Sequence, residues 1–354
     1  MKARSGPVFW FLCGSPAKAS SRLQGYLISR EFAKIGVQSV IVYGRENPGG
    51  RDFSPFARPN LHVNLRGTTA VIQKLYGLHT DSLIDWLRCC GSTIAYVVCD
   101  FRSKNETWKK ADIVLATSAA LARDYTEQSG SQVQTVFDPF EYSLDPEAVG
   151  RSHLGGRLKI VWFGDKSNWY ALEGWKRILE SDYPDRVELL TVSNHPNATW
   201  QWSMDAQRHA LGIADIGIVP TGSGPDAQFK SANRLTQLMA MGVPAIVGDL
   251  ESYREIRDQG LPVFIATNEI GFKRALERLL DSDYRRNVAK DAYQMTLQRF
   301  SPEMAARRWM EVLGIEVGAQ DTPGRLRGMA VAAAVGGILR TMILAASVRR
   351  RLRL

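Results

Sequence analysis

The sequence predicts an α/β protein with two domains, each built on a parallel sheet. The chain has 354 residues, of which 45% are hydrophobic and 23% charged, so it can fill two cores and does not have the composition of a disordered protein. Strand and helix patterns alternate in two series along it. Between the two series, residues 141–157 lose periodicity and are rich in glycine, proline and charge, which is typical of a linker. We therefore expect one domain at 1–145 and a second at 158–300.

The first domain opens with the pattern of a βαβ unit. An apolar run at 7–14 precedes a helical pattern at 22–36 and a second apolar run at 39–44. Basic residues and Ala17-x-Ala19 also give this terminus some likeness to a signal peptide, but the βαβ unit accounts for the same apolar run and is favoured. The other elements expected here are strands at 61–65, 94–100, 111–118 and 133–139 and helical stretches near 68–90.

The second domain shows the same alternation. Short apolar runs rich in β-branched residues predict strands at 158–164, 187–192, 213–220, 243–249 and 261–266. Helical segments separate most of them, which predicts a second parallel sheet. Ligands of such open sheets usually bind beyond the carboxyl ends of the strands.

Residues 229–242, "FKSANRLTQLMAMG", predict a helix with an unusual charge distribution. Its apolar stripe at helical spacing consists of Leu235, Leu238 and Met239. Ser231 is the expected N-cap and Gly242 the expected stop. Lys230 and Arg234 lie near the positive end of the helix dipole, where each should cost roughly 0.3–1 kcal/mol unless an anion is bound. The pattern therefore indicates an anion site, and the alternative is a pair of solvated surface charges.

Three segments of the chain resemble the GT-B glycosyltransferases, especially the retaining, metal-independent enzymes with a family-1-type C-terminal domain. Residues 214–256 resemble their donor-binding half, and residues 111–125 resemble the last strand and helix of their N-terminal domain. Residues 281–313 resemble their closing helices, of which the last, expected at 301–320, returns to the first domain. The resemblance implies two Rossmann-like domains that face each other across a cleft.

The resemblance identifies the expected anion as the diphosphate of a nucleotide sugar. It implies that Lys230 and Arg234 stabilise the leaving diphosphate and that Ser231 and Asn233 help to bind it. The chemistry implied needs no cofactor and no metal. Many of these enzymes carry two glutamates with seven residues between them, whereas this chain has Phe229 and Gln237 at the matching positions. Gln237 remains a candidate for hydrogen bonding to a donor hydroxyl.

Further donor contacts are expected in three loops that follow strands. In "WFGDKSNW", Gly164 would let backbone approach a phosphate and Lys166 would add a positive charge. Asp226, in "TGSGPDAQ", is a candidate ligand for a sugar hydroxyl. Tyr253 and Glu255 follow the predicted strand at 243–249, and Tyr253 is equally compatible with a packing role.

The acceptor is expected on the first domain. Ser21, Arg22 and Gly25 lie at the mouth of its first strand, where the resembling enzymes bring a loop and a helix start toward the diphosphate or the acceptor. Asp100 and Arg102 follow the strand predicted at 94–100. Polar residues end strands in every α/β protein, so these five are candidates only.

The sequence contains no motif of a metal site or of a serine hydrolase. The five histidines show no metal-ligand spacing, and no G-x-S-x-G motif is present. The four cysteines, Cys13, Cys89, Cys90 and Cys99, show no C-x-x-C spacing. We interpret them as reduced thiols of a cytoplasmic protein.

Residues 322–354 form a basic terminal segment. They contain seven arginines and no acidic residue, and so hold seven of the nine net positive charges. This concentration argues against a general nucleic-acid surface. An apolar stretch at 329–348 approaches the length of a membrane span, but Arg340 near its middle would cost roughly 2.5–3.5 kcal/mol there. We predict an amphipathic helix on the cytoplasmic face of an anionic membrane; a helix packed on its own domain and a disordered tail are the alternatives.

The resemblance implies a glycosyltransferase that moves a sugar from a nucleotide sugar to a glycan or lipid-linked saccharide. The Lys-x-x-Asn-Arg pattern at 230–234 resembles a branch found among cell-surface polysaccharide enzymes, which implies a role in surface polysaccharide assembly. Two alternatives stay open: a nucleotide-sugar epimerase of the same fold, and a non-catalytic nucleotide-sugar or glycan-binding partner of another transferase. The sequence does not determine the base, the sugar, the linkage, or whether the anomeric configuration is retained.

Overall fold

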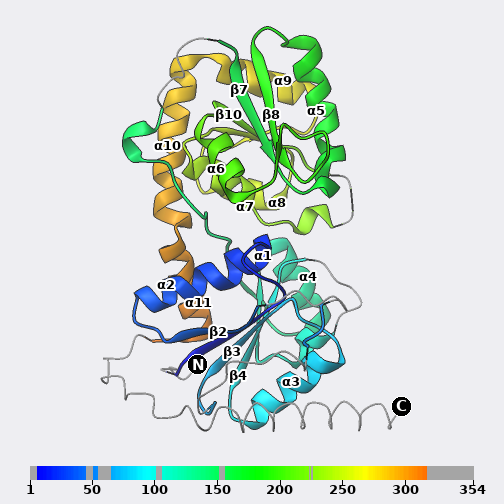
Figure 1. Cartoon of the computed structure of the whole chain (residues 1–354), viewed down its shortest axis with the longest axis vertical. Helices are drawn as coiled ribbons and strands as arrows, with labels where there is room; N and C mark the ends of the chain where they lie inside the picture. The colour runs from blue at the N-terminus through cyan, green and yellow to red at the C-terminus, as the bar shows by residue number, and fades with distance from the viewer. Residues whose placement is uncertain are drawn as a thin grey trace. The chain divides into compact units, whose positions relative to one another are not determined.

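The computed structural model describes residues 6–44, 51–54, 65–100, 106–150, 156–222, 224 and 226–316. The chain forms two compact units, one containing residues 1–136 together with those from 302 onward, the other containing Phe137–Ser301. Each unit holds one six-stranded sheet with helices, so the predicted α/β class is confirmed (Figure 1).

The first unit contains a parallel sheet in the order β2-β1-β3-β4-β5-β6. Its strands are β1 (Val8–Leu12), β2 (Ser39–Gly44), β3 (Thr69–Gln73), β4 (Thr93–Val98), β5 (Ile113–Ala116) and β6 (Gln134–Thr135). Its helices are α1 (Ala19–Ser21), the π-helical η1 (Arg22–Tyr26), α2 (Leu27–Lys34), α3 (Leu78–Cys89), η2 (Thr107–Lys110), α4 (Ala119–Ser129) and α11 (Pro302–Leu313).

Helices cover both faces of this sheet. Trp10 of β1 packs against Phe32 of α2 and Trp309 of α11, with ring centroids 5.8 and 5.3 Å apart. In Figure 1, α3 and α4 lie on the opposite side of the sheet from α2 and α11. In the strand order, β2 lies on one side of β1 and β3 to β6 lie on the other, so the chain crosses the sheet in both directions. Because each crossover between parallel strands is right-handed, the two directions place helices on opposite faces.

The strand β3 corrects one sequence-based expectation. Residues 69–73, "TAVIQ", were expected within a helical stretch that begins near 68, but they pair along their length with β1 and β4. The run is apolar and β-branched and follows Gly67, whose φ of 76° is left-handed, so local sequence and tertiary pairing agree on a strand. The strand expected at 61–65 lies outside the described residues except for Leu65.

The second unit contains a parallel sheet in the order β12-β11-β10-β7-β8-β9. Its strands are β7 (Leu158–Phe163), β8 (Val187–Ser193), β9 (Trp200–Gln201), β10 (Ile216–Val219), β11 (Ala245–Val247) and β12 (Phe264–Ile265). Its helices are η3 (Pro146–Ala148), η4 (Lys166–Asn168), α5 (Trp169–Asp182), α6 (Met204–Gly212), η5 (Ala227–Phe229), α7 (Asn233–Ala240), α8 (Glu251–Asp258), α9 (Glu269–Leu280) and α10 (Ser282–Phe300). All five predicted strands are present, and β9 was not predicted.

Alternation along the central strand β7 explains why both faces of this sheet are buried. Ile160 and Trp162 belong to a core formed with α5 and α9, whereas Val161 and Phe163 belong to a core formed with α6, α7, α8 and α10. All four side chains are at most 8% exposed. Because both faces are filled by apolar side chains, the loops after the strands are where this unit can place polar groups.

The boundaries of the units differ from the predicted ones. The segment 137–150 packs within the second unit: Phe137 stacks edge-on against Phe300 at 5.4 Å, and the Tyr293 hydroxyl donates to the Leu144 carbonyl at 2.8 Å. The change of unit therefore occurs at 136/137, before the linker expected at 141–157. After Ser301 the chain returns to the first unit as α11.

The terminal segment at 322–354, with its predicted amphipathic helix, lies outside the described residues. Among the helices that the structure does describe, none has the length and hydropathy needed to cross a bilayer.

Candidate functional site

The second unit carries a pocket at the carboxyl ends of its central strands. Its cavity of about 230 Å³ is enclosed by three stretches that follow β7, β10 and β11, together with the first turn of α7. The lining residues are Asn168 and Tyr170 after β7; Thr221, Gly222, Gly224, Asp226, Ala227 and Lys230 after β10; Arg234 on α7; and Leu250 after β11. The pocket thus lies where ligands of parallel sheets usually bind.

The first turn of α7 differs from the expected one in its cap. Ala232 is the N-cap residue, and it has no side-chain acceptor for the first N–H groups of the helix. Ser231 was expected in this role, but its hydroxyl donates instead to the Asp138 carboxylate at 2.5 Å, so the prediction of Ser231 as N-cap was wrong. The helix ends at Ala240 and Gly242 adopts a left-handed φ of 68°, as predicted.

Arg234 is the most informative residue of the pocket. Its Nη1 is buried and has no hydrogen-bond partner. Its guanidinium also lies against the buried phenol of Tyr253. Burial raises the pKa of that phenol, and the charge and hydrogen bond of Arg234 offset only part of the increase. Tyr253 therefore stays neutral near pH 7 and leaves the charge of Arg234 uncompensated.

A buried cationic N–H group without a partner is costly, commonly by about 1–3 kcal/mol or more. Here it lies beside an uncapped helix N-terminus, which also favours negative charge. Lys230, four residues earlier, lines the same pocket and adds a second positive side chain. The three features together fit an anionic ligand, and a phosphate group has the acceptor oxygens to engage all of them.

Gly164, at the end of β7, lies beside this guanidinium. A Cβ atom at Gly164 would be 3.0 Å from the Trp162 ring, which is a tight contact, and 3.5 Å from Arg234 Nη1, which is an ordinary one. Lys166, predicted in the same loop, is exposed in η4 and does not line the pocket. Its backbone N–H donates to Asn194 Oδ1 at 2.6 Å.

Sequence reasoning missed two residues of that loop. Asn168 and Tyr170 line the pocket, and the Tyr170 side chain is half-exposed. A Cβ atom at Gly222 would be 2.0 Å from the Tyr170 hydroxyl, so the position must be glycine for the ring to lie there. The glycine-rich loop after β10 was the signal available in the sequence, because glycines allow another side chain to lie close to the backbone.

Gln237 does not reach the pocket. It is 4% exposed, its Oε1 accepts the Glu141 N–H at 2.8 Å, and its Nε2 donates to the Tyr142 carbonyl at 2.8 Å. Both ends of the amide are therefore used to hold the segment 137–150 against α7, and the expected contact with a donor hydroxyl is not supported. Asn233 and Glu255, both partly buried, also lie outside the pocket lining, whereas Asp226 is part of it.

Most acceptor-side candidates have internal roles in the first unit. The Ser21 hydroxyl donates to Gln73 Oε1 at 3.3 Å, and Arg22 Nη1 donates to the carbonyl of Pro16 at 2.7 Å. Gly25 packs on Leu12, because a Cβ atom there would be 2.4 Å from Leu12 Cδ1. Arg102 lies outside the described residues.

Asp100 is the acceptor-side candidate that reaches a pocket. It follows β4 and is ion-paired with Lys74 and Arg51, two residues that sequence reasoning missed. Elsewhere, within the part of the chain that the structure describes, no three His, Cys, Asp or Glu side chains gather as a metal site would require.

A chain that contains two such units is similar to several solved structures. The catalytic domain of starch synthase IV from Arabidopsis thaliana, bound to ADP and acarbose, has a TM-score of 0.62 and 10% identity over 87% of this chain and 99% of that one. Sucrose-phosphate synthase from Thermosynechococcus elongatus has a TM-score of 0.61 and 13% identity, over 88% and 98% of the two chains. HepE from Anabaena, in complex with UDP and glucose, has a TM-score of 0.58 and 12% identity, over 87% and 99%.

The chain has the GT-B fold. At these identities the similarity establishes the fold alone. The sequence matches no protein-family model and no curated protein. Activity must therefore be argued from the GT-B site itself.

The hydrogen bonds of Gln237 lead to a prediction about the missing glutamate. Gln237→Glu restores the residue type of the resembling enzymes, but it replaces the donating amide with a carboxylate that faces the Tyr142 carbonyl. We expect the free energy of unfolding to fall by about 1–3 kcal/mol in urea denaturation at neutral pH. The loss should shrink at acidic pH, where a protonated carboxyl group can again donate.

Gln207→Glu is the matched control. Gln207 is 5% exposed and its Nε2 donates to the Tyr142 hydroxyl at 2.8 Å. A hydroxyl can reverse and donate to a carboxylate, whereas a carbonyl cannot. Equal losses in the two variants at neutral pH would contradict the role given to Gln237.

Proposed function

We propose that this protein is a glycosyltransferase that transfers a sugar from a nucleotide diphosphate sugar to a glycan or lipid-linked saccharide in surface polysaccharide assembly. The observation that carries the proposal is the buried, unpartnered Nη1 of Arg234 beside the uncapped N-terminus of α7. Both groups favour the same ligand chemistry, which is a dense negative charge with several acceptor oxygens.

The catalytic roles follow from where charge develops. When the glycosidic bond of the donor breaks, negative charge accumulates on the departing diphosphate. Arg234 and the N–H groups of α7 stabilise that charge from fixed positions, and Lys230 adds a second cation. The donor's own phosphate oxygen takes the acceptor proton, and the sugar keeps its anomeric configuration. Because two side chains and a helix dipole neutralise the leaving group, the reaction proceeds without a bound metal.

The remaining pocket residues suit the other parts of a donor. The half-exposed ring of Tyr170 and the amide of Asn168 give one wall an apolar face and a hydrogen-bonding group. The Asp226 carboxylate, on the same loop as Lys230, accepts hydrogen bonds from sugar hydroxyls. One of the structural neighbours is bound to ADP and another to UDP, which supports the proposal that this GT-B protein binds a nucleotide.

Nucleotide binding tests the role of Arg234. UDP and ADP should be titrated calorimetrically into the wild type and into Arg234→Gln, and we expect the better nucleotide to bind the variant about 10- to 100-fold more weakly. The melting temperature of the free variant should change little, because removing a buried nitrogen without a partner offsets the loss of the hydrogen bond to Tyr253. Arg186→Gln removes an exposed arginine that pairs with Glu277 at 3.3 Å and serves as the control. If neither of these nucleotides binds the wild type, and GDP and dTDP do not bind it either, the donor site is refuted.

Turnover tests the reaction. The wild type should release nucleoside diphosphate from a panel of nucleotide sugars in the presence of a glycolipid fraction, and Lys230→Ala should lower kcat by about 10²–10³. The wild-type rate should be unchanged by EDTA. Isomerised donor in the absence of acceptor would instead identify an epimerase, and binding of donor without any turnover would identify a non-catalytic partner.

We also propose peripheral attachment to the cytoplasmic face of the membrane through the basic residues 322–354, each arginine adding about 1 kcal/mol near an anionic leaflet. Full-length protein should float with anionic liposomes, and a chain that ends at Asp321 should not. High salt should partly release the full-length protein. Equal flotation of the two chains would remove this part of the proposal.

A further inference from the structure

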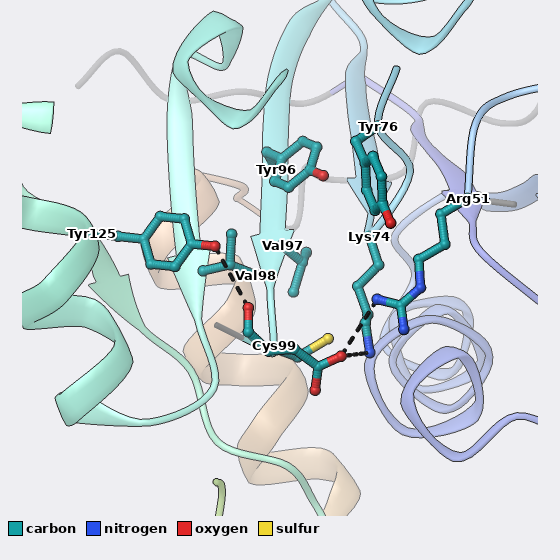
Figure 2. A pocket seen from close by; sticks show the side chains of 9 residues that line it. Arg51, Lys74, Tyr76, Tyr96, Val97, Val98, Cys99 and Tyr125 are labelled. Atoms are coloured by element: carbon teal, nitrogen blue, oxygen red, sulfur yellow. Dashed lines mark hydrogen bonds and ion pairs between the residues drawn. The ribbon is translucent and has the colours of Figure 1, made fainter. Parts of the chain in front are cut away.

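A second, smaller pocket lies in the first unit, at the carboxyl ends of β3 and β4 (Figure 2). Arg51, Lys74, Tyr76, Cys99 and Asp100 are among its lining residues. The enclosed space measures about 10 Å³, which is what one water-sized group requires. It can therefore receive a single small polar group, such as a carboxylate or a phosphate oxygen, while the rest of a ligand stays outside.

The charges around this space do not balance. Lys74 Nζ forms an ion pair with Asp100 Oδ2, and Arg51 Nη1 lies 3.4 Å from the same oxygen. The Lys74 side chain is only 10% exposed. Burial alone would lower the pKa of Lys74, but the neighbouring Cys99 and Asp100 raise it above its ordinary value, so the lysine is charged at neutral pH. Two largely buried cations thus share one carboxylate oxygen.

The backbone at Lys74 is strained. Its φ is 56°, and among the described residues it is the one non-glycine residue with a positive φ. Such a conformation costs on the order of 1–3 kcal/mol and is concentrated at functional sites. Glycine or asparagine would adopt it at lower cost. A lysine at position 74 therefore lowers the stability of the fold relative to glycine or asparagine, and what it provides in return is a positive charge.

Hydrogen bonds hold the surrounding strand ends in place. Gln73, directly before Lys74, accepts the Cys13 N–H at 3.2 Å, and its Nε2 donates to Gln24 Oε1 at 3.3 Å. The Tyr125 hydroxyl, which is labelled in Figure 2, donates to the Asp100 carbonyl at 3.5 Å. The Arg51 carbonyl accepts the Tyr76 N–H at 3.0 Å, so the backbone of both cations is held, which lowers the entropic cost of binding a ligand.

We propose that this pocket recognises an anionic group, a carboxylate or a phosphate, on the acceptor sugar. Such a group would engage Lys74 and Arg51 together and balance the excess positive charge, which a neutral hydroxyl would leave in place. Asp100 then acts as a positioning residue that orients the two cations and does not itself contact the acceptor. That the ligand is an acceptor sugar rests on the proposed transferase function. That the pocket binds an anion rests only on the residues of the first unit.

Ligand-observed NMR titrations of the full-length protein at low ionic strength test the site. The probes are glucose, glucuronate and glucose 6-phosphate, which separate a neutral sugar from a carboxylate and a phosphate. We expect at least one acidic sugar to bind the wild type at least about tenfold more tightly than glucose, and Lys74→Asn to remove that preference. The tighter of the two acidic probes identifies the anion.

Three controls keep the result interpretable. Asparagine tolerates the left-handed backbone, so Lys74→Asn should fold, and Arg51→Gln gives a second, less buried variant that should weaken the same probe. Lys110→Asn removes a lysine of the same unit that pairs with Asp85 at 2.6 Å on the surface, and should leave the preference unchanged. UDP and ADP should bind Lys74→Asn as they bind the wild type.

The outcomes separate the two proposals. Equal binding of glucose and both acidic sugars, or a preference that survives in both Lys74→Asn and Arg51→Gln, would overturn the anion site whatever the nucleotide titrations give. Loss of nucleotide binding with an intact acidic-sugar preference would overturn only the donor site.

Discussion

Burial of both faces of two parallel sheets is the constraint on which this structure depends. Parallel strands need crossover helices, and those helices cover the sheet on both sides. Along β7 the alternate side chains fill two separate cores, with Trp162 in one and Phe163 in the other. The polar chemistry of each unit is consequently concentrated in the loops and helix starts that follow the strands.

Each unit uses this place to hold a positive charge that the protein does not fully neutralise. In the second unit it is Arg234, whose Nη1 is buried without a partner. In the first unit Lys74 and Arg51 share one oxygen of Asp100. Keeping such charges away from water is unfavourable unless a ligand of opposite charge completes the site. Both sites thus point to anions, although one is a roomy pocket and the other admits a single group.

The hydrogen bonds of Gln237 explain why a glutamine suits this position, where many of the resembling enzymes have the second of two glutamates. The residue donates one hydrogen bond and accepts another, both with the backbone of residues 141–142. A carboxylate can accept but cannot donate, so a glutamate would lose one of the two bonds. At this position the chain uses α7 to hold the segment that joins the units, and the pocket retains Arg234 one turn earlier on the same helix.

The sequence by itself determined the α/β class, the five strands recognised in the second domain, the helix that ends before Gly242, and the placement of Lys230 and Arg234 at its start. These features depend on periodicity, β-branched runs and turn residues, which act over a few neighbouring positions. Only the tertiary structure decided which polar side chains remain available. Ser231 is taken by Asp138, 93 residues away, and Gln237 by Glu141, 96 residues away. Lys74 was missed because residues 69–73 were assigned to a helix in spite of their β-branched run, and because its partner Asp100 comes from the end of another strand. Hydrogen bonds and ion pairs between distant segments leave no local periodicity, so they become visible only once the strands are paired.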